Sequence, residues 1–236
     1  MPLQGLLLID KPKTWTSFDV VNYVRKIVAT ANGTKPKNTK VGHTGTLDPM
    51  ATGLLVLLVG KDYTRRAGEL SKLDKTYEVT MKLGETSTTA DEEGEKTVVS
   101  DMIPTEKAVL AALERLQGQI MQVPPAFSAM KINGQRAYKL AREGKAVELE
   151  ARPVTIHSNE LTAYEYPFVR FTSRVSSGTY IRSLVVDLGE LLETGAYMSD
   201  LRRTSIGEFD LSNGLPVEGI DASKIEAALT TLPEAA

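Results

Sequence analysis

The sequence predicts an α+β fold, with a mixed and mainly antiparallel central sheet and helices packed against it. Three observations support this class. Residues 54–59 form an unbroken apolar run with the length of a buried strand, and residues 76–83 alternate apolar and polar side chains. Residues 18–28 and 105–116 instead carry apolar side chains at helical spacing. Because 42% of the 236 residues are hydrophobic, the chain has enough apolar material for a substantial core.

The N-terminal elements follow from short local patterns. Residues 6–9 predict a buried strand, and Ser17 is the expected N-cap of a helix that runs to about Thr30. The apolar side chains at helical spacing in that helix are Phe18, Val21, Val24, Ile27 and Val28. Residues 31–40 predict a polar, basic loop, and the strand at residues 54–59 is expected to be covered on both faces.

The remaining elements are read in the same way. After the strand at residues 76–83, a helix at 105–116 should bury one face, formed by Val109, Leu110, Leu113 and Leu116. Further strands are expected at 127–132, before a tight-turn signal at Asn133 and Gly134, and at 154–164 and 169–175. Thr179 or Ser177 should cap a helix that runs to Leu192 and is closed by Gly195, and a short helix is expected at 221–229.

Composition excludes some classes of site and favours one compartment. The chain has no cysteine, so disulfides and thiolate metal sites are ruled out. No apolar run reaches the length of a membrane span, and the N-terminus lacks the pattern of a signal peptide. We therefore expect a soluble cytoplasmic protein.

Charge is distributed unevenly along the chain. The formal net charge is −2, which by itself argues weakly against a nucleic-acid partner. Residues 11–40, however, hold seven Lys or Arg and a single acid, Asp19, whereas residues 208–236 hold six acids and one lysine. A molecule with one basic face is compatible with RNA, although ordinary scattered surface charge is the simpler alternative.

The segment at residues 40–53 is the most informative part of the chain. It combines three glycines with His43 and Asp48, and the buried strand follows at once. Pro49 fixes its own φ and restricts Asp48 to extended conformations, so one carboxylate is presented in a defined pose. This arrangement suits a nucleophile or a positioned base. The alternative is a glycine-rich turn with a solvated aspartate.

These residues resemble the catalytic loop of the TruB family of tRNA pseudouridine synthases. Other segments resemble the family's motifs in the same order: residues 5–12, 16–21, 74–79, 124–131, 138–144 and 175–184, with 187–189 after them. The resemblance implies a pseudouridine-synthase-like catalytic domain that isomerises uridine 55 in the T-loop of tRNA. The reaction breaks the C1′–N1 bond of uridine, turns the base and joins C5 to C1′, and it requires neither metal nor cofactor. The sequence carries no dinucleotide fingerprint, phosphate-binding loop or metal-ligand cluster.

The resemblance also assigns roles to individual residues. It implies that Asp48 is the catalytic carboxylate, that Arg182 forms a salt bridge favouring its ionisation, and that Tyr77 stacks on the target base and helps to remove the C5 proton. His43 would fill the space that the flipped nucleotide leaves. Tyr180 and Leu201 would line the pocket, and Lys11 would contact phosphate or serve a structural role. Further candidate phosphate contacts are Lys131, Arg136, Arg142 and the lysines of residues 35–40.

The sequence departs from the family pattern in places, and it leaves alternatives open. Thr14 stands where glycine is frequent in the family, and Thr88 where aspartate is usual. We expect a catalytic domain at residues 1–207 and a short extension at 208–236, without a complete C-terminal RNA-binding domain, in a monomer that binds the tRNA T-stem-loop. One alternative is the catalytic subunit of a guide-RNA-dependent box H/ACA particle. Another is a non-catalytic tRNA-binding or tRNA-folding module.

Overall fold

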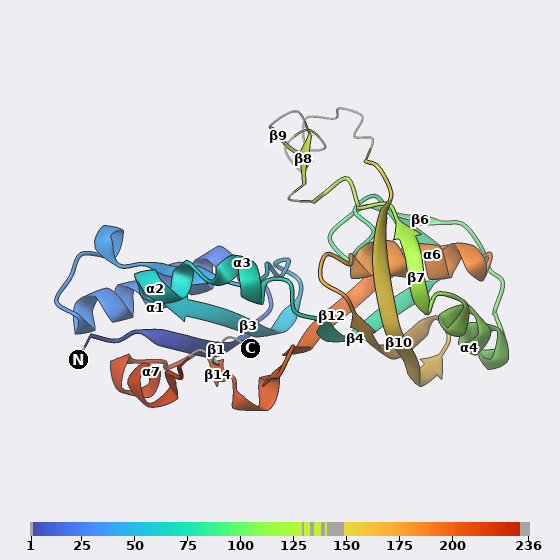
Figure 1. Cartoon of the computed structure of the whole chain (residues 1–236). Coiled ribbons are helices and arrows are strands. Elements are labelled where there is room, and N and C mark those ends of the chain that lie inside the picture. Colours follow the sequence, from blue (N-terminus) through green and yellow to red (C-terminus); the bar gives the residue numbers. More distant parts are fainter. Residues whose placement is uncertain (1, 129, 133–134, 138–139, 141–148, 232–236) are drawn as a thin grey trace. The chain divides into compact units, whose positions relative to one another are not determined.

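The computed structural model describes residues 2–128, 130–132, 135–137, 140 and 149–231. The chain forms two compact units (Figure 1). The first unit comprises Met1–Tyr77 and Arg202–Ala236, and the second comprises Glu78–Leu201. The chain therefore enters the second unit within strand β4 (Lys75–Leu83) and leaves it within strand β12 (Ala196–Ile206).

The first unit is a small sheet covered by helices. Its strands follow the order β14–β1–β3–β12, and β2 also pairs with β3. The β3–β12 and β1–β14 pairs are parallel, whereas β1–β3 and β2–β3 are antiparallel. Its elements are β1 (Gly5–Lys11), α1 (Ser17–Ala31), the 3₁₀ helix η1 (Pro36–Asn38), β2 (Val41–His43), β3 (Thr52–Val59), α2 (Lys61–Thr64), α3 (Ala67–Leu70), the end of β12 (Ala196–Ile206), β13 (Phe209–Asp210), η2 (Leu211–Asn213), β14 (Leu215–Pro216) and α7 (Ala222–Ala228).

The sheet of the first unit is buried on both faces, as the sequence predicts for residues 54–59. Leu55, Leu57 and Val59 face one core cluster, which contains residues of α1 and α7. Leu54 and Val56 face a second cluster, which includes residues of α2 and α3. Strand alternation thus sends successive β3 side chains into different cores, and an uninterrupted apolar sequence results.

Helix α1 confirms the predicted helix but not its predicted cap. Thr16 is the N-cap: its hydroxyl accepts from the Asp19 amide at 3.0 Å, and the Asp19 carboxylate accepts from the Thr16 amide at 2.9 Å. Ser17 is already helical and buried. Its hydroxyl is bonded to a distant loop, so it is not available to cap the helix.

The second unit is a sheet with a helical layer, and its β10–β11 and β10–β7 pairs are antiparallel. Its strand order is β12–β4–β11–β10–β7, and helix α4 contacts both β10 and helix α6. Its elements are β4 (Lys75–Leu83), β5 (Glu85–Ser87), β6 (Lys96–Val98), α4 (Glu106–Arg115), β7 (Gly118–Gln122), β8 (Lys131–Ile132), β9 (Gln135–Arg136), β10 (Arg152–Glu165), β11 (Phe168–Val175), α6 (Ile181–Leu191) and the beginning of β12. The first residues of β4 belong to the first unit.

Several predictions for this unit are confirmed and others are wrong. Strands β4, β10 and β11 and helices α4 and α6 match the predicted segments. In α4, however, Leu110 is exposed, and Ala112 joins Val109 and Leu113 on the buried face. The predicted Asn133–Gly134 turn lies outside the described residues. No helix in the described ranges is long and apolar enough to cross a membrane.

Two further corrections have clear physical reasons. The strand predicted at residues 127–132 is reduced to Lys131–Ile132, because Phe127 lies in a bend and its carbonyl accepts a hydrogen bond from a distant arginine. Helix α6 begins after Tyr180, without a Ser or Thr cap. The side-chain amide of Gln122 instead accepts from the Tyr180 amide at 2.8 Å and so satisfies a donor at the helix start.

Thr14 adopts a left-handed conformation, with φ of 72°. This region is strained for a β-branched residue, and glycine enters it without penalty. Glycine, which the sequence resemblance leads us to expect at this position, would adopt the conformation without that strain. The Thr14 amide donates to the Pro49 carbonyl at 2.8 Å, so the strained turn also holds part of the loop that carries Asp48.

We expect Thr14→Gly to raise the free energy of unfolding by roughly 0.5–1 kcal/mol, because relief of left-handed strain exceeds the added freedom of the unfolded chain. The exposed Thr14 side chain has little packing to lose. Urea unfolding of the purified variant measures the change. Lys35→Gly is the control, because Lys35 is exposed and has an ordinary φ of −87°. A Thr14→Gly variant that is no more stable than Lys35→Gly would show that Thr14 is not strained.

Candidate active site

The backbone is anchored on both sides of Asp48, within the first unit. Before it, the Ser17 hydroxyl accepts from the Leu47 amide at 2.8 Å and donates to the Leu47 carbonyl at 3.0 Å. After it, the Pro49 carbonyl accepts from the Thr14 amide. Asp48 itself is half-buried. The residues that flank the carboxylate are therefore fixed by contacts from outside the loop.

Lys11 strengthens this anchoring from a fully buried position. Its ammonium donates to the carbonyls of Pro12 at 2.9 Å, Trp15 at 2.6 Å and Pro49 at 3.4 Å. Burial lowers the pKa of Lys11 to about 8, whereas attraction by Asp48 opposes this shift. The ammonium is therefore still protonated at pH 7. Of the two roles predicted for Lys11, this geometry favours the structural one over phosphate contact.

Arg203, in β12, connects the two ends of the Asp48 loop. Its Nε donates to the Leu54 carbonyl at 2.8 Å, and its Nη2 donates to the Gly45 carbonyl at 3.0 Å. Its side chain is 1% exposed. Gly53 is paired with Arg203 and has a φ of +98°, and a Cβ there would collide with the Arg203 carbonyl oxygen. Glycine at this position is what allows β12 to approach the loop so closely.

His43 lies at the end of β2 with its ring in a neutral state. Burial and the nearby Arg203 guanidinium both lower the pKa of His43, so the imidazole is uncharged at pH 7. Its Nδ1 is buried and has no hydrogen-bond partner among the residues that the structure describes. A flat, uncharged ring of this kind is suited to stacking against a nucleobase.

Tyr77 and Lys75 lie on the same face of β4, in the part that belongs to the first unit. Tyr77 is buried, with 7% of its surface exposed. The Lys75 ammonium donates to the carbonyls of Leu73 at 2.6 Å and Ser71 at 3.1 Å. Burial, and then repulsion by Arg203, lower the pKa of Lys75 to about 8. Lys75 is thus a further buried cation beside the glycine-rich loop, which it approaches at Gly45.

Arg182 is buried in the second unit, in the first turn of α6. Its Nη2 donates to the Phe127 carbonyl at 2.9 Å, and its Nη1 to the Thr89 carbonyl at 3.3 Å. Nη1 also lies 3.4 Å from a carboxylate oxygen of Asp91, which is itself buried. The family resemblance implies a salt bridge between Arg182 and Asp48. That pairing stays a prediction, because the two residues belong to different units.

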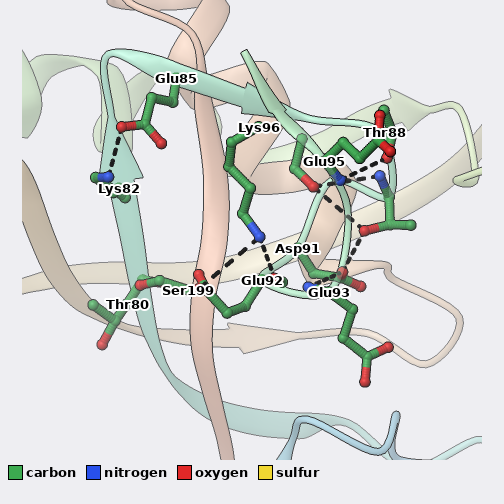
Figure 2. Close-up of polar contacts among 12 residues, drawn as sticks. Thr80, Lys82, Glu85, Thr88, Asp91, Glu92, Glu93, Glu95, Lys96 and Ser199 are labelled. Atoms are coloured by element: carbon green, nitrogen blue, oxygen red, sulfur yellow. Dashed lines mark hydrogen bonds and ion pairs between the residues drawn. The ribbon is translucent and has the colours of Figure 1, made fainter. Parts of the chain in front are cut away.

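Asp91 owes its position to the β5–β6 hairpin (Figure 2). Its Oδ1 accepts from the Thr89 hydroxyl at 2.5 Å and from the Glu93 amide at 3.1 Å. Figure 2 also shows Thr88 facing Glu95, and the two residues exchange hydrogen bonds that close the hairpin. Thr88, which departs from the family pattern, therefore serves the hairpin, while Asp91 supplies the carboxylate that Arg182 contacts.

A cavity of about 410 Å³ in the second unit lies next to these contacts. Thr89 and Phe127, whose carbonyls bind Arg182, both line it. Asp187 also lines it, and burial followed by repulsion from Glu190 raises the pKa of Asp187 to about 6.

The other predicted contacts are placed as follows. Tyr180 is half-buried at the start of α6, and Leu201 is 7% exposed in β12. Lys131 lies in β8, and Arg142 lies outside the described residues. Lys35, Lys37 and Lys40 are exposed in the first unit. The structure thus brings Asp48, Lys11 and His43 together around one loop, while Arg182 and Tyr180 share one helix start in the other unit.

Sequence reasoning missed the roles of Arg203, Asp91 and Ser17. Arg203 lies at the end of the stretch that resembles the family. Composition does not distinguish it from its neighbour Arg202, which is equally basic but half-exposed and paired with Asp10 at 2.7 Å. A useful signal would have been strand alternation, because Arg203 shares a strand face with Leu201 and should therefore point inward.

The site offers carboxylate and cation chemistry. Across the described ranges there is no group of three or more His, Cys, Asp or Glu that could hold a metal ion. What the first unit presents is one positioned carboxylate, buried cations bonded to the backbone, and a neutral imidazole. These groups suit attack on, or charge stabilisation at, an electron-poor carbon.

Comparisons with known proteins agree with this chemistry. Residues 32–181 match the model of the TruB family pseudouridylate synthase N-terminal domain, and residues 182–230 match the tRNA pseudouridylate synthase B C-terminal domain. Because the second match begins before residue 207, the domain boundary expected there stays a prediction.

Two curated relatives illustrate the similarity. A protein of Chlorobaculum tepidum named tRNA pseudouridine synthase B is 44% identical over 231 residues, covering 97% of this chain and 93% of that protein. A protein of Protochlamydia amoebophila with the same name is 45% identical over 213 residues, covering 90% of this chain and 78% of that protein.

Solved structures show the same fold. A chain in a Cbf5–Nop10–Gar1 complex is 27% identical with a TM-score of 0.71, covering 96% of this chain and 60% of that chain. A chain of an H/ACA RNP bound to a substrate RNA is 25% identical with a TM-score of 0.67, covering 94% of this chain and 58% of that chain. The matched models, the curated relatives and the shared fold lead to one conclusion: the chain belongs to the TruB family of pseudouridylate synthases.

Proposed function

We propose that this protein isomerises uridine to pseudouridine in tRNA, at uridine 55 of the T-loop. The observation that carries the proposal is the identity of 44–45% to proteins named tRNA pseudouridine synthase B, over at least 90% of the chain. The anchored Asp48 loop is the structural feature that fits this chemistry, because the reaction needs a carboxylate in a defined pose.

Asp48 acts on the uridine in this proposal. An ionised carboxylate can attack C1′, add to C6 of the base, or stabilise positive charge while the C1′–N1 bond breaks. All three routes leave atoms and electrons balanced, because the base that leaves C1′ through N1 is the base that returns through C5. At the end C5 loses its proton and the freed N1 gains one, so the change is a net isomerisation, and Tyr77 is the residue that we propose assists the loss from C5.

The remaining groups bind and orient the RNA. His43 is neutral and flat, so it can occupy the stacking position left by the extruded nucleotide. Arg182 orients the carboxylate in this proposal, and Tyr180 and Leu201 line the pocket. The exposed lysines at 35, 37 and 40 are suited to phosphate contact, which contributes affinity without sequence preference.

The guide-RNA-dependent alternative receives less support. The solved H/ACA structures share the fold, but their identity to this chain is 25–27%, compared with 44–45% for the tRNA enzymes. A non-catalytic module is disfavoured because Asp48, Tyr77 and Arg182 are all present. The direct test is to incubate the purified protein with an unmodified tRNA transcript and map pseudouridine. The proposal requires modification at position 55 without a guide RNA, and it fails if the transcript stays unmodified or is modified elsewhere.

We expect Asp48→Asn to abolish turnover while RNA affinity stays within about two-fold, because the amide keeps the shape of the side chain but not its charge. Single-turnover release of tritium from 5-tritiated uridine measures the rate, and filter binding measures affinity. Asp62→Asn is the control, since Asp62 is an exposed carboxylate of the same unit whose partner is Arg65. Appreciable turnover by Asp48→Asn would remove Asp48 from the chemistry.

Tyr77→Phe should fold and bind RNA normally but react about 100- to 10,000-fold more slowly, as expected when a group that assists proton transfer is lost. The measurement is the single-turnover rate at saturating RNA. Tyr63→Phe, in the same unit, removes a hydroxyl without affecting β4 and should react like the unchanged protein. If Tyr77→Phe also reacts at the normal rate, Tyr77 contributes stacking and no proton transfer.

A further inference from the structure

Phe18 is an exposed aromatic side chain in the first turn of α1. Its side chain is 61% exposed, whereas the next most exposed aromatic residues among those described, Tyr166 and Phe168, are 37% exposed. Single exposed apolar side chains are common on proteins and need no explanation by themselves. The neighbours of Phe18 and its position in the site give it a specific use.

A cation accompanies the ring. The Arg25 guanidinium carbon lies 6.0 Å from the centre of the Phe18 ring. Arg25 is held there by two hydrogen bonds, from Nη1 to the Asn22 side chain at 2.6 Å and from Nη2 to the Val41 carbonyl at 3.1 Å. The pair therefore presents an aromatic face next to a fixed positive charge.

This pair lies beside the Asp48 loop. The residue before Phe18, Ser17, is bonded to both backbone groups of Leu47, which directly precedes Asp48. Val41, which holds Arg25, is the first residue of β2, the strand that ends at His43. Phe18 is thus next to a residue that is bonded to the Asp48 loop, and Arg25 is bonded to the strand that ends at His43.

The surrounding charge favours RNA as the ligand. The single acid in residues 11–40 is Asp19, and its carboxylate is engaged by the Thr16 amide and hydroxyl in the capping box. The other charged residues of that segment are basic. An aromatic face with an adjacent guanidinium in a basic segment is the combination that proteins use to stack unpaired bases.

We propose that Phe18 and Arg25 form a stacking subsite for an unpaired base of the RNA substrate, separate from the site of the target uridine. The inference rests on the proposed function, because it takes the Asp48 loop to be where RNA is bound. The base stacks against the Phe18 ring, and the Arg25 guanidinium, which lies over that ring, adds electrostatic attraction.

The first test compares affinities for an unmodified T-stem-loop RNA. Phe18→Ala should weaken binding by about 5- to 150-fold, the range seen when one base–aromatic stack is removed. Phe18→Trp should bind at least as tightly as the unchanged protein, whereas Phe18→Leu should bind like Phe18→Ala because it lacks a ring. Arg25→Met should weaken binding about two- to five-fold, because the cation contributes less than the ring.

Ile103→Ala is the matched control, since Ile103 is an apolar side chain of similar exposure, 64%, in the other unit. It should leave affinity unchanged. Because Phe18 is exposed, all its variants should melt at the temperature of the unchanged protein. If Phe18→Ala binds like the unchanged protein, or if Phe18→Leu binds normally, the stacking subsite is disproved.

A second measurement identifies the base and separates this inference from the proposed function. Each loop nucleotide of the RNA is made abasic in turn. The affinity for each RNA is then measured with the unchanged protein and with Phe18→Ala. One abasic substitution should weaken binding only when Phe18 is present, and additive effects at every position would overturn the subsite. Pseudouridine formation is assayed separately, so a protein that forms pseudouridine but shows no such coupling refutes the subsite alone. A protein that shows the coupling but forms no pseudouridine refutes the proposed function alone.

Discussion

Hydrogen bonds from two buried cations to loop carbonyls are the interactions on which the rest of the site depends. Lys11 is fully buried and Arg203 is 1% exposed, and each donates to the loop that carries Asp48. Burying a cation is unfavourable unless its donors are satisfied, and a loop carbonyl without a strand partner is unfavourable for the same reason. Here the same hydrogen bonds satisfy the donors of Lys11 and Arg203 and the carbonyls that accept from them. The result is a loop with one well-defined conformation, in which the carboxylate is oriented before any substrate arrives.

Each unit organises its own charged group by contacts within that unit. The first holds Asp48 between anchored neighbours, with neutral His43 close by in sequence and in fold. The second holds Arg182 against Asp91 and two carbonyls. Tyr77 and Leu201 are the residues after which the chain passes from one unit to the other. Two of the residues singled out by family resemblance therefore mark the two passages of the chain.

Local patterns in the sequence predicted many of the elements but not the bonds between them. The apolar run of β3 and the helical spacing of α1 and α4 reflect burial, which each residue's own type reveals. Ser17 was expected to cap α1, yet its hydroxyl binds Leu47, thirty positions away. Arg203 reaches carbonyls about 150 residues distant, and Gln122 caps α6 across 58 positions. Such contacts depend on the assembled fold. The strand β12 was missed because its polar residues interrupt the alternation on which a strand prediction rests.

The most direct test of this account compares Arg203→Lys with Arg202→Lys. Lysine at position 203 keeps the charge but cannot bridge the carbonyls of Gly45 and Leu54 with the planar fork of arginine. The account predicts that Arg203→Lys speeds hydrogen exchange at the Leu47 and Ala51 amides and lowers the single-turnover rate by about 10- to 100-fold at unchanged RNA affinity. Arg202→Lys, at the half-exposed neighbour, should change neither quantity. Normal exchange and a normal rate in Arg203→Lys would contradict the claim that Arg203 positions the loop of Asp48.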